Sequence, residues 1–241
     1  MKNALVNHKE RLDGVRELLN SFKPSLRKGK SLTFSEKERR LASPIYSTAS
    51  ILPIAYFEVF IDTIILRLVD DINANSHTFD WTKLPPQIRK AHIENTITVL
   101  KKIKRKESCD IEDVSEHIKS IINYTSQPYL VHKYRCEIEA LLKSKSNYHA
   151  SRINDLFNSI GLTDIFLRIS KQSNLKSLNR ELIRDKLEEL CHRRDQAAHG
   201  VDILNTGVTI QNMKDGITFI TNISESFVLI LEDYLRRIRL V

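Results

Sequence analysis

Apolar residues recur every three or four positions along most of the chain, which is the spacing of one face of an α-helix. This spacing predicts amphipathic helices near residues 3–21 and 211–239. Between Pro44 and about Ile72 the residues are apolar on most sides, which predicts a long helix at the centre of a bundle. The pattern therefore predicts an all-α fold.

Two further helices are predicted over residues 87–106 and 111–124, beyond a pair of prolines through which no helix continues. The helical spacing is weaker over 135–166. Only 6 Gly and 6 Pro punctuate the 241 residues, which argues against a sandwich of many strands and tight turns. We expect residues 44–241 to form a helical domain and residues 1–43 a helical and basic extension, within one compact unit overall.

The helix predicted over residues 180–199 holds the most informative feature of the chain. Asn179 is a residue type that caps helix N-termini, and Gly200 suits the left-handed position after a helix C-terminus. Arg194 falls on the apolar stripe of this helix, so its charge is predicted to point inward. An inward arginine must pair with an anion or face a cavity that receives one, and a salt bridge that only fixes helix packing is the alternative. The stripe consists of Ile183, Leu187, Leu190, Cys191 and Ala198.

The formal net charge of the chain is +8, and basic residues cluster in runs at 27–30, 101–106 and 236–239. Such runs suit a phosphate backbone or an acidic partner. For any single run, a solvated helix surface is the more ordinary explanation. The balance over the whole chain favours an anionic polymer as partner.

The three cysteines are widely spaced and include no Cys-x-x-Cys pair, which is typical of free thiols in a reducing cytosol. The N-terminus lacks the uninterrupted apolar core of a signal peptide. The longest apolar stretch, 51–69, contains charged residues and a proline, which makes it a poor membrane span. We therefore expect a cytoplasmic protein with no membrane association.

Three stretches of the chain resemble one family. RDQAAHG at 194–200 resembles the signature of the HEPN superfamily of all-α proteins, in which an arginine is followed by Asn, Asp or His and a histidine closes the motif. IAYFEVFI at 54–61 resembles an early core helix of its RiboL-PSP-like branch, where an aromatic residue precedes a glutamate, and IGLTDIF at 160–166 is also similar. The resemblance spans roughly residues 45–238, with Asp195 standing where asparagine is commoner.

The resemblance implies a HEPN-like helical bundle that forms a symmetric dimer, and a metal-independent endoribonuclease whose active site lies across the dimer interface. RNA carries its own nucleophile in the 2′-hydroxyl, so the protein needs a base, an acid and a cation, with no metal or other cofactor. Arg194 would clamp the scissile phosphate, His199 would transfer protons, and Asp195 would orient either one. Arg193 would add a second phosphate contact. Glu58 would pair with one of the two arginines, or it forms a structural ion pair with no part in the chemistry.

The expected function is cleavage of single-stranded RNA in a toxin–antitoxin or antiviral defence setting, by a homodimer that an antitoxin or a second defence protein accompanies. The alternative is a catalytically inactive helical module that binds RNA or a protein partner. A metal site is not expected, because His192 and His199 share a helical face but the sequence places no further ligands nearby.

Overall fold

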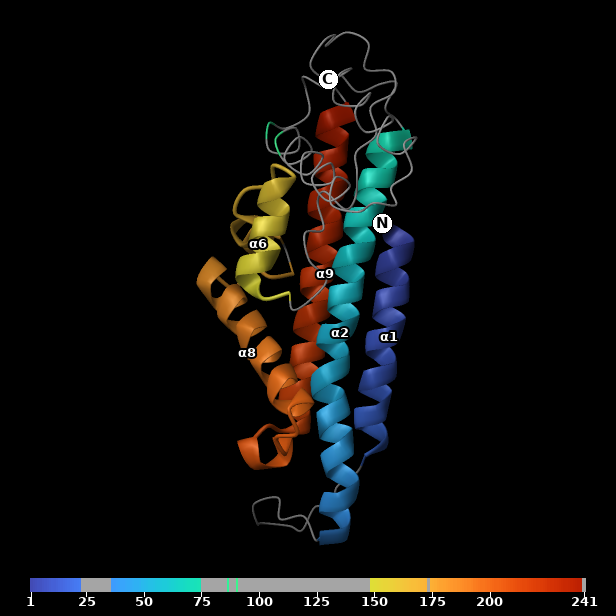
Figure 1. The fold of residues 1–241 in the computed structure, drawn as a ribbon, viewed down its shortest axis with the longest axis vertical. Coiled ribbons are helices and arrows are strands. Elements are labelled where there is room, and N and C mark those ends of the chain that lie inside the picture. Colours follow the sequence, from blue (N-terminus) through green and yellow to red (C-terminus); the bar gives the residue numbers. More distant parts are fainter. Residues whose placement is uncertain (23–35, 75–85, 87–89, 91–147, 173, 240–241) are drawn as a thin grey trace, which may run out of the picture. The chain divides into compact units, whose positions relative to one another are not determined.

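The computed structural model describes residues 1–22, 36–74, 86, 90, 148–172 and 174–239. These residues form six α-helices and one short 3-10 helix, and none of them lies in a strand. The all-α fold predicted from the apolar spacing is confirmed. The elements are α1 (Lys2–Ser21), α2 (Glu36–Ala74), α6 (Ala150–Ser159), α7 (Ile165–Ser170), α8 (Arg180–Ala198), η2 (Ile203–Thr206) and α9 (Ile210–Arg239), as Figure 1 shows.

Several sequence predictions lie outside the described residues. They concern the helix over 111–124, the helix over 87–106 apart from Lys90, and the basic runs at 27–30 and 101–106. Cys109 and Cys136 lie outside them as well.

The chain divides into two compact units. The first draws on residues 1–63, 147–150 and 166–228, and the second on residues 64–146, 151–165 and 229–241. In the second unit, the Tyr234 hydroxyl donates a hydrogen bond of 2.7 Å to the carbonyl oxygen of Ile160. Every residue of the candidate site described below belongs to the first unit.

Helix α2 begins at Glu36, well before the start predicted at Pro44, so that prediction is wrong. Pro44 and Pro53 both lie inside the helix. A proline in a helix interior lacks the N–H of one backbone hydrogen bond and costs about 3 kcal/mol. Burial of residues such as Phe57 and Ile61, which are fully inaccessible to solvent, offsets that cost. The boundary expected between residues 43 and 44 therefore falls inside a continuous helix.

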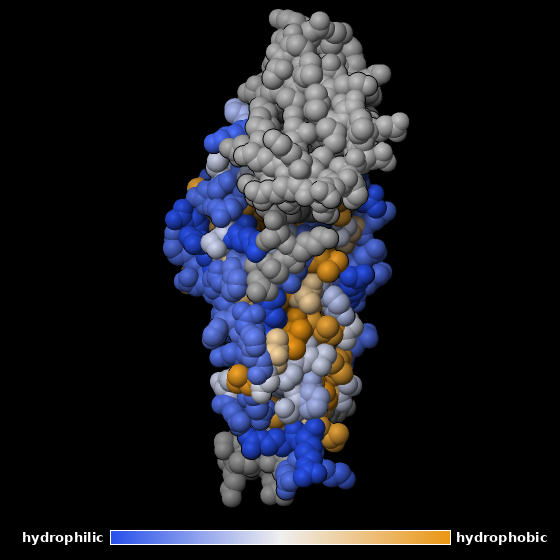
Figure 2. All heavy atoms as spheres, in the orientation of Figure 1, coloured by the Kyte–Doolittle hydropathy of each residue, from blue (hydrophilic) through white to orange (hydrophobic). Residues whose placement is uncertain are grey.

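Within the described residues, α2 is long and apolar enough to cross a membrane by length and composition alone, with a mean hydropathy of 1.8 in its most apolar window. Half of that window is buried within the structure, and the core helix of a globular bundle has the same composition. Hydrophobic side chains also form a band along α2 on the face shown in Figure 2. Leu41 and Val59 of this helix are 61% and 50% exposed.

The core of the first unit joins α1, α2 and α9. Phe57 of α2 stacks on Phe227 of α9 with ring centroids 6.0 Å apart. His8 of α1 is only 3% exposed, stacks on Phe60 of α2 at 4.6 Å, and places its Nε2 3.0 Å from the Ser224 hydroxyl of α9. These contacts bury the apolar face of α1 that the spacing predicted.

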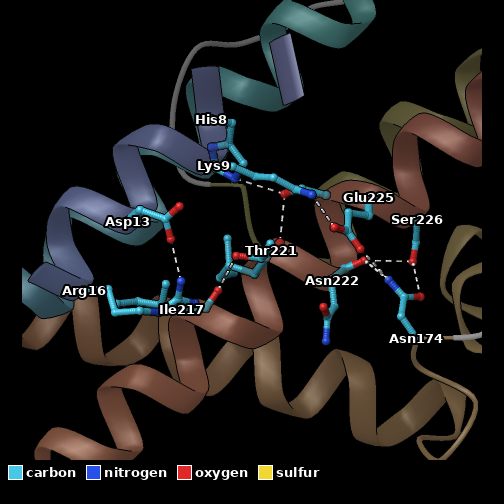
Figure 3. A network of polar contacts seen from close by, with 12 residues as sticks. His8, Lys9, Asp13, Arg16, Asn174, Ile217, Thr221, Asn222, Glu225 and Ser226 are labelled. Carbon is cyan, nitrogen blue, oxygen red and sulfur yellow. Dashed lines mark hydrogen bonds and ion pairs between the residues drawn. The ribbon is translucent and has the colours of Figure 1, made fainter. Parts of the chain in front are cut away.

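Next to His8, a chain of polar contacts holds α1 against α9 (Figure 3). Lys9 Nζ lies 2.5 Å from Glu225 Oε1. Asn174 Nδ2 donates to Glu225 Oε2 at 3.1 Å, and the Ser226 hydroxyl donates to Asn174 Oδ1 at 3.3 Å. The N-terminal helix is thus fixed to the helix that ends the chain.

The buried imidazole of His8 predicts a loss of stability in acid. Burial, together with the nearby Arg11 charge, lowers the pKa of His8 from 6.5 to about 4. The unfolded chain therefore binds this proton more tightly than the folded one, so His8 leaves stability intact above pH 6.5 and reduces it as the pH falls toward 4. We expect a loss of about 3 kcal/mol in the free energy of unfolding once the pH is below 4.

Urea unfolding followed by circular dichroism at pH 7, 5.5 and 4.5 checks this prediction. His8→Gln removes the titrating group, so the fall in stability between pH 7 and 4.5 should be smaller for this variant than for the wild type. Equal pH dependence in the two proteins would show that His8 is not the group responsible.

Candidate active site

Helix α8 presents the motif that the sequence singled out, and both of its predicted caps are confirmed. Asn179 Oδ1 accepts a hydrogen bond of 2.8 Å from the Leu182 N–H, and Gly200 has a φ of +81°, in the left-handed region. Ala198 was expected to face inward, but it is the last residue of α8 and stays exposed. The residues of α8 that are buried are Ile183, Leu187, Cys191, Arg194 and Ala197.

Arg194 points inward, as its place on the apolar stripe predicted, and is only 8% exposed. Its Nη1 donates a hydrogen bond of 2.9 Å to Glu58 Oε1 of α2, which is one of the two pairings that the sequence offered for Glu58. Its Nε lies 2.6 Å from Asp195 Oδ1 without the alignment of a hydrogen bond, and Nη2 is buried with no hydrogen-bond partner among the described residues. The Nε–Nη2 edge, which can bind a carboxylate or phosphate with two parallel bonds, is thus not satisfied by hydrogen bonds.

Neighbouring carboxylates stabilise the charged form of Arg194. Burial alone would lower the pKa of Arg194, but the hydrogen bond that Arg194 donates to Glu58 and the negative charges of Glu58 and Asp195 outweigh burial, so the pKa lies above its ordinary value. A buried cation between two carboxylates is a stable structural unit and also a permanent positive charge in a small space.

Tyr148 connects the two carboxylates of α2 that face this cluster. Its backbone N–H donates a hydrogen bond of 3.0 Å to Glu58 Oε1, and its hydroxyl donates to Asp62. Cys191 Sγ lies 3.7 Å from the Tyr148 carbonyl oxygen. Burial raises the pKa of the Cys191 thiol to about 12, so this cysteine is a packing residue and not a nucleophile.

His149 is the residue that sequence reasoning missed. Its Nδ1 lies 2.6 Å from Glu188 Oε2, and its Nε2 lies 3.9 Å from Asp195 Oδ2. Glu188 Oε1 accepts a hydrogen bond of 2.7 Å from the backbone N–H of Ala150, so the backbone holds this carboxylate in place. One sequence feature could have indicated such a residue. Glu188 and Asp195 stand seven residues apart on one face of α8, where a third polar group can bridge them.

His199 is exposed at the C-cap of α8, and its backbone N–H donates a hydrogen bond of 2.9 Å to the Asp195 carbonyl oxygen. Five residues of helix place its side chain roughly 140° around the axis from Arg194. The structure gives no contact between the Arg194 and His199 side chains among the described residues. Within one chain, His199 instead follows Asp195 by four residues on the same face.

Arg193 does not join this cluster. Its Nη2 lies 2.5 Å from Glu189 Oε1. Its side chain lines a cavity of only about 10 Å³ together with Pro53 of α2 and Met213 of α9. The expected second phosphate contact would therefore need Arg193 to leave this packing.

Nowhere among the described residues do three His, Cys, Asp or Glu side chains come together in an arrangement that could hold a metal ion. The polar groups present suit proton transfer and anion binding.

A family model described as RiboL-PSP-HEPN matches residues 10–233. The chain belongs to the RiboL-PSP-HEPN family. The match begins inside α1, well before residue 45 where the motif resemblance began, and it includes the whole of α8 with its RDQAAHG stretch. No curated protein and no solved structure matches the chain. For this RiboL-PSP-HEPN protein the family and the all-α fold are therefore established.

Proposed function

We propose that this RiboL-PSP-HEPN protein is a metal-independent endoribonuclease that cleaves single-stranded RNA. The observation that carries the proposal is the state of Arg194, an inward cation on the helix that ends in the exposed His199. The Nε–Nη2 edge of Arg194 makes no hydrogen bond to any described residue. A guanidinium edge of this kind fits two oxygens of a phosphate.

The reaction needs only groups that RNA and this site provide. The 2′-oxygen attacks the adjacent phosphorus, the bond from phosphorus to the 5′-oxygen breaks, and the products are a 2′,3′-cyclic phosphate and a 5′-hydroxyl. Arg194 binds the phosphate in place of the Asp195 carboxylate and stabilises the negative charge that develops there. His199 transfers a proton. Asp195 aligns Arg194 before substrate arrives.

A homodimer is part of the proposal. Arg194 and His199 lie on different sides of α8, and a symmetric pair of subunits would place one copy of each in a shared groove. The apolar band on α2 supports such an interface, because Val59 is half exposed and directly follows Glu58 of the site. We further propose a cytoplasmic toxin–antitoxin or antiviral defence role, with an antitoxin or second defence protein as partner.

One observation favours the alternative function, a helical module that binds RNA or a protein without cleaving. Arg194 already forms ion pairs with both Glu58 and Asp195, and such a buried cluster can serve helix packing alone. A protein of this kind would keep the arginine for packing alone.

The two functions separate in a cleavage assay. Purified protein is incubated with end-labelled single-stranded RNA, and with DNA of the same sequence, in the presence and absence of EDTA. We expect cleavage of RNA alone, at the same rate with and without chelator. Binding of RNA without cleavage would support the inactive module, and cleavage abolished by EDTA would contradict a metal-independent reaction.

A further inference from the structure

We propose that His149 is the general base of the ribonuclease, so that the site contains two histidines with different tasks. The inference rests on the proposed function and extends it to a residue outside the RDQAAHG motif. It is drawn from the geometry of His149, Glu188, Asp195 and His199.

A hydrogen bond to Glu188 fixes the orientation of the His149 ring. Glu188 accepts at 2.6 Å from Nδ1 of His149, and the Ala150 N–H holds Glu188 from its other oxygen. With its proton on Nδ1, a neutral imidazole carries its lone pair on Nε2 and can accept a proton there. A carboxylate that orients the ring of a histidine in this way is the usual support of a general base.

The other ring nitrogen of His149, Nε2, makes no hydrogen bond to any described residue. It lies 3.9 Å from Asp195 Oδ2, which is beyond hydrogen-bond distance, and no other described residue bonds it. The His149 side chain is 36% exposed and that of Asp195 34%. The two side chains that meet at this nitrogen are therefore both partly open to solvent.

The polar residues of α8 near His149 lie on one face of the helix. Glu188, Asp195 and His199 stand seven and four residues apart, so they share one face of the helix. His149 lies over the first two, and His199 follows Asp195 by one turn, a rise of about 6 Å. Two imidazoles so placed can serve the two ends of one phosphodiester, whose phosphate would be bound by the Arg194 that the proposed dimer places in the same groove.

The proton transfers then balance. His149 Nε2 takes the proton of the 2′-hydroxyl while the 2′-oxygen bonds to phosphorus. The bond from phosphorus to the 5′-oxygen breaks, and His199 gives that oxygen a proton. The protonated His149 and deprotonated His199 return to their starting states by exchange with water.

The decisive variant is His149→Asn. The asparagine amide can still donate to Glu188 in place of Nδ1, but it offers no nitrogen that accepts a proton. We expect RNA cleavage to fall by at least about 10²-fold with RNA affinity unchanged. The matched control is His192→Asn, because His192 is exposed on the same helix and bonds only Gln196 among the described residues, and we expect it to cleave at the wild-type rate.

A modified RNA distinguishes base from acid. In an RNA whose scissile 5′-oxygen is replaced by sulfur, the leaving thiolate needs no proton, so only the base remains essential. We expect His199→Ala to recover cleavage on this substrate and His149→Asn to stay at least about 10²-fold slow. If circular dichroism shows that His149→Asn does not fold, Glu188→Gln takes its place, with an expected loss of at least about tenfold on both substrates.

The outcomes separate the two proposals. A wild-type protein that cleaves no RNA overturns the proposed function and this inference together. If the wild type cleaves and His199→Ala does not, but His149→Asn cleaves within about threefold of wild type, only the inference is wrong. Recovery of His149→Asn on the sulfur substrate also overturns it, because His149 would then not be the base.

Discussion

Replacing Arg194 with leucine is expected to lower the free energy of unfolding by about 3–5 kcal/mol. The substitution leaves Glu58 and Asp195 as carboxylates without their cation, and Glu58 is held in a partly buried place by the Tyr148 N–H. The unpaired charges cost more than the salt bridge itself contributes, because the ions have already lost much of their hydration. Urea unfolding followed by circular dichroism at pH 7, at one protein concentration, measures the change.

Arg40→Leu is the matched control, since Arg40 pairs with Glu36 at 2.7 Å on a fully solvated surface. That change should stay within about 0.5 kcal/mol. The double variant Arg194→Leu with Glu58→Gln should lose less free energy of unfolding than the sum of the losses of the two single variants. The glutamine removes the unpaired charge and can still accept the hydrogen bond from the Tyr148 N–H. A loss below about 1 kcal/mol for Arg194→Leu alone would show that Arg194 does not hold the cluster together.

His199→Ala is expected to reduce RNA cleavage by at least about 10²-fold while the free energy of unfolding changes by less than about 0.5 kcal/mol. The imidazole is exposed, and the hydrogen bond that closes α8 uses the backbone N–H, which alanine keeps. A loss of cleavage therefore reports on chemistry and not on folding. Initial rates on labelled RNA, together with urea unfolding of the same preparations, give both quantities.

His192→Ala is the control for this second prediction, because it removes an exposed imidazole about two helical turns before His199. It should cleave RNA at the wild-type rate. If His199→Ala also cleaves at that rate, the terminal histidine of the motif has no part in proton transfer, and only a binding role is left for it.

The sequence was sufficient to predict those features of the site that follow from the helical spacing or from residues close together in the chain. The 3.6-residue spacing alone placed Arg194 on the buried side of α8, and burial of a permanent charge then required a carboxylate. Glu58 met that requirement because it is a single glutamate among apolar residues of α2. Asn179 and Gly200 fixed the ends of α8 through side-chain and backbone chemistry that is local.

The sequence was insufficient to predict features that depend on packing between segments far apart in the chain. His149 precedes Glu188 by 39 residues, and it lies within the stretch of weak helical spacing, so nothing in the pattern joins the two. Pro44 resembles a helix start, but burial of the following residues carries α2 through it. Arg193 and Arg194 look equivalent in sequence, yet a 100° step around the helix sends them to different neighbours.

The chemistry of the cut ends tests the central claim most directly. Purified protein is given an RNA and the same RNA with one 2′-deoxynucleotide on the 5′ side of the preferred cleavage position, and the fragments are weighed by mass spectrometry. A reaction through the 2′-hydroxyl predicts fragments that end in a 2′,3′-cyclic phosphate and a 5′-hydroxyl, with cleavage blocked at the deoxy position. Fragments that carry a 3′-hydroxyl and a 5′-phosphate, or continued cleavage at the deoxy position, would contradict it.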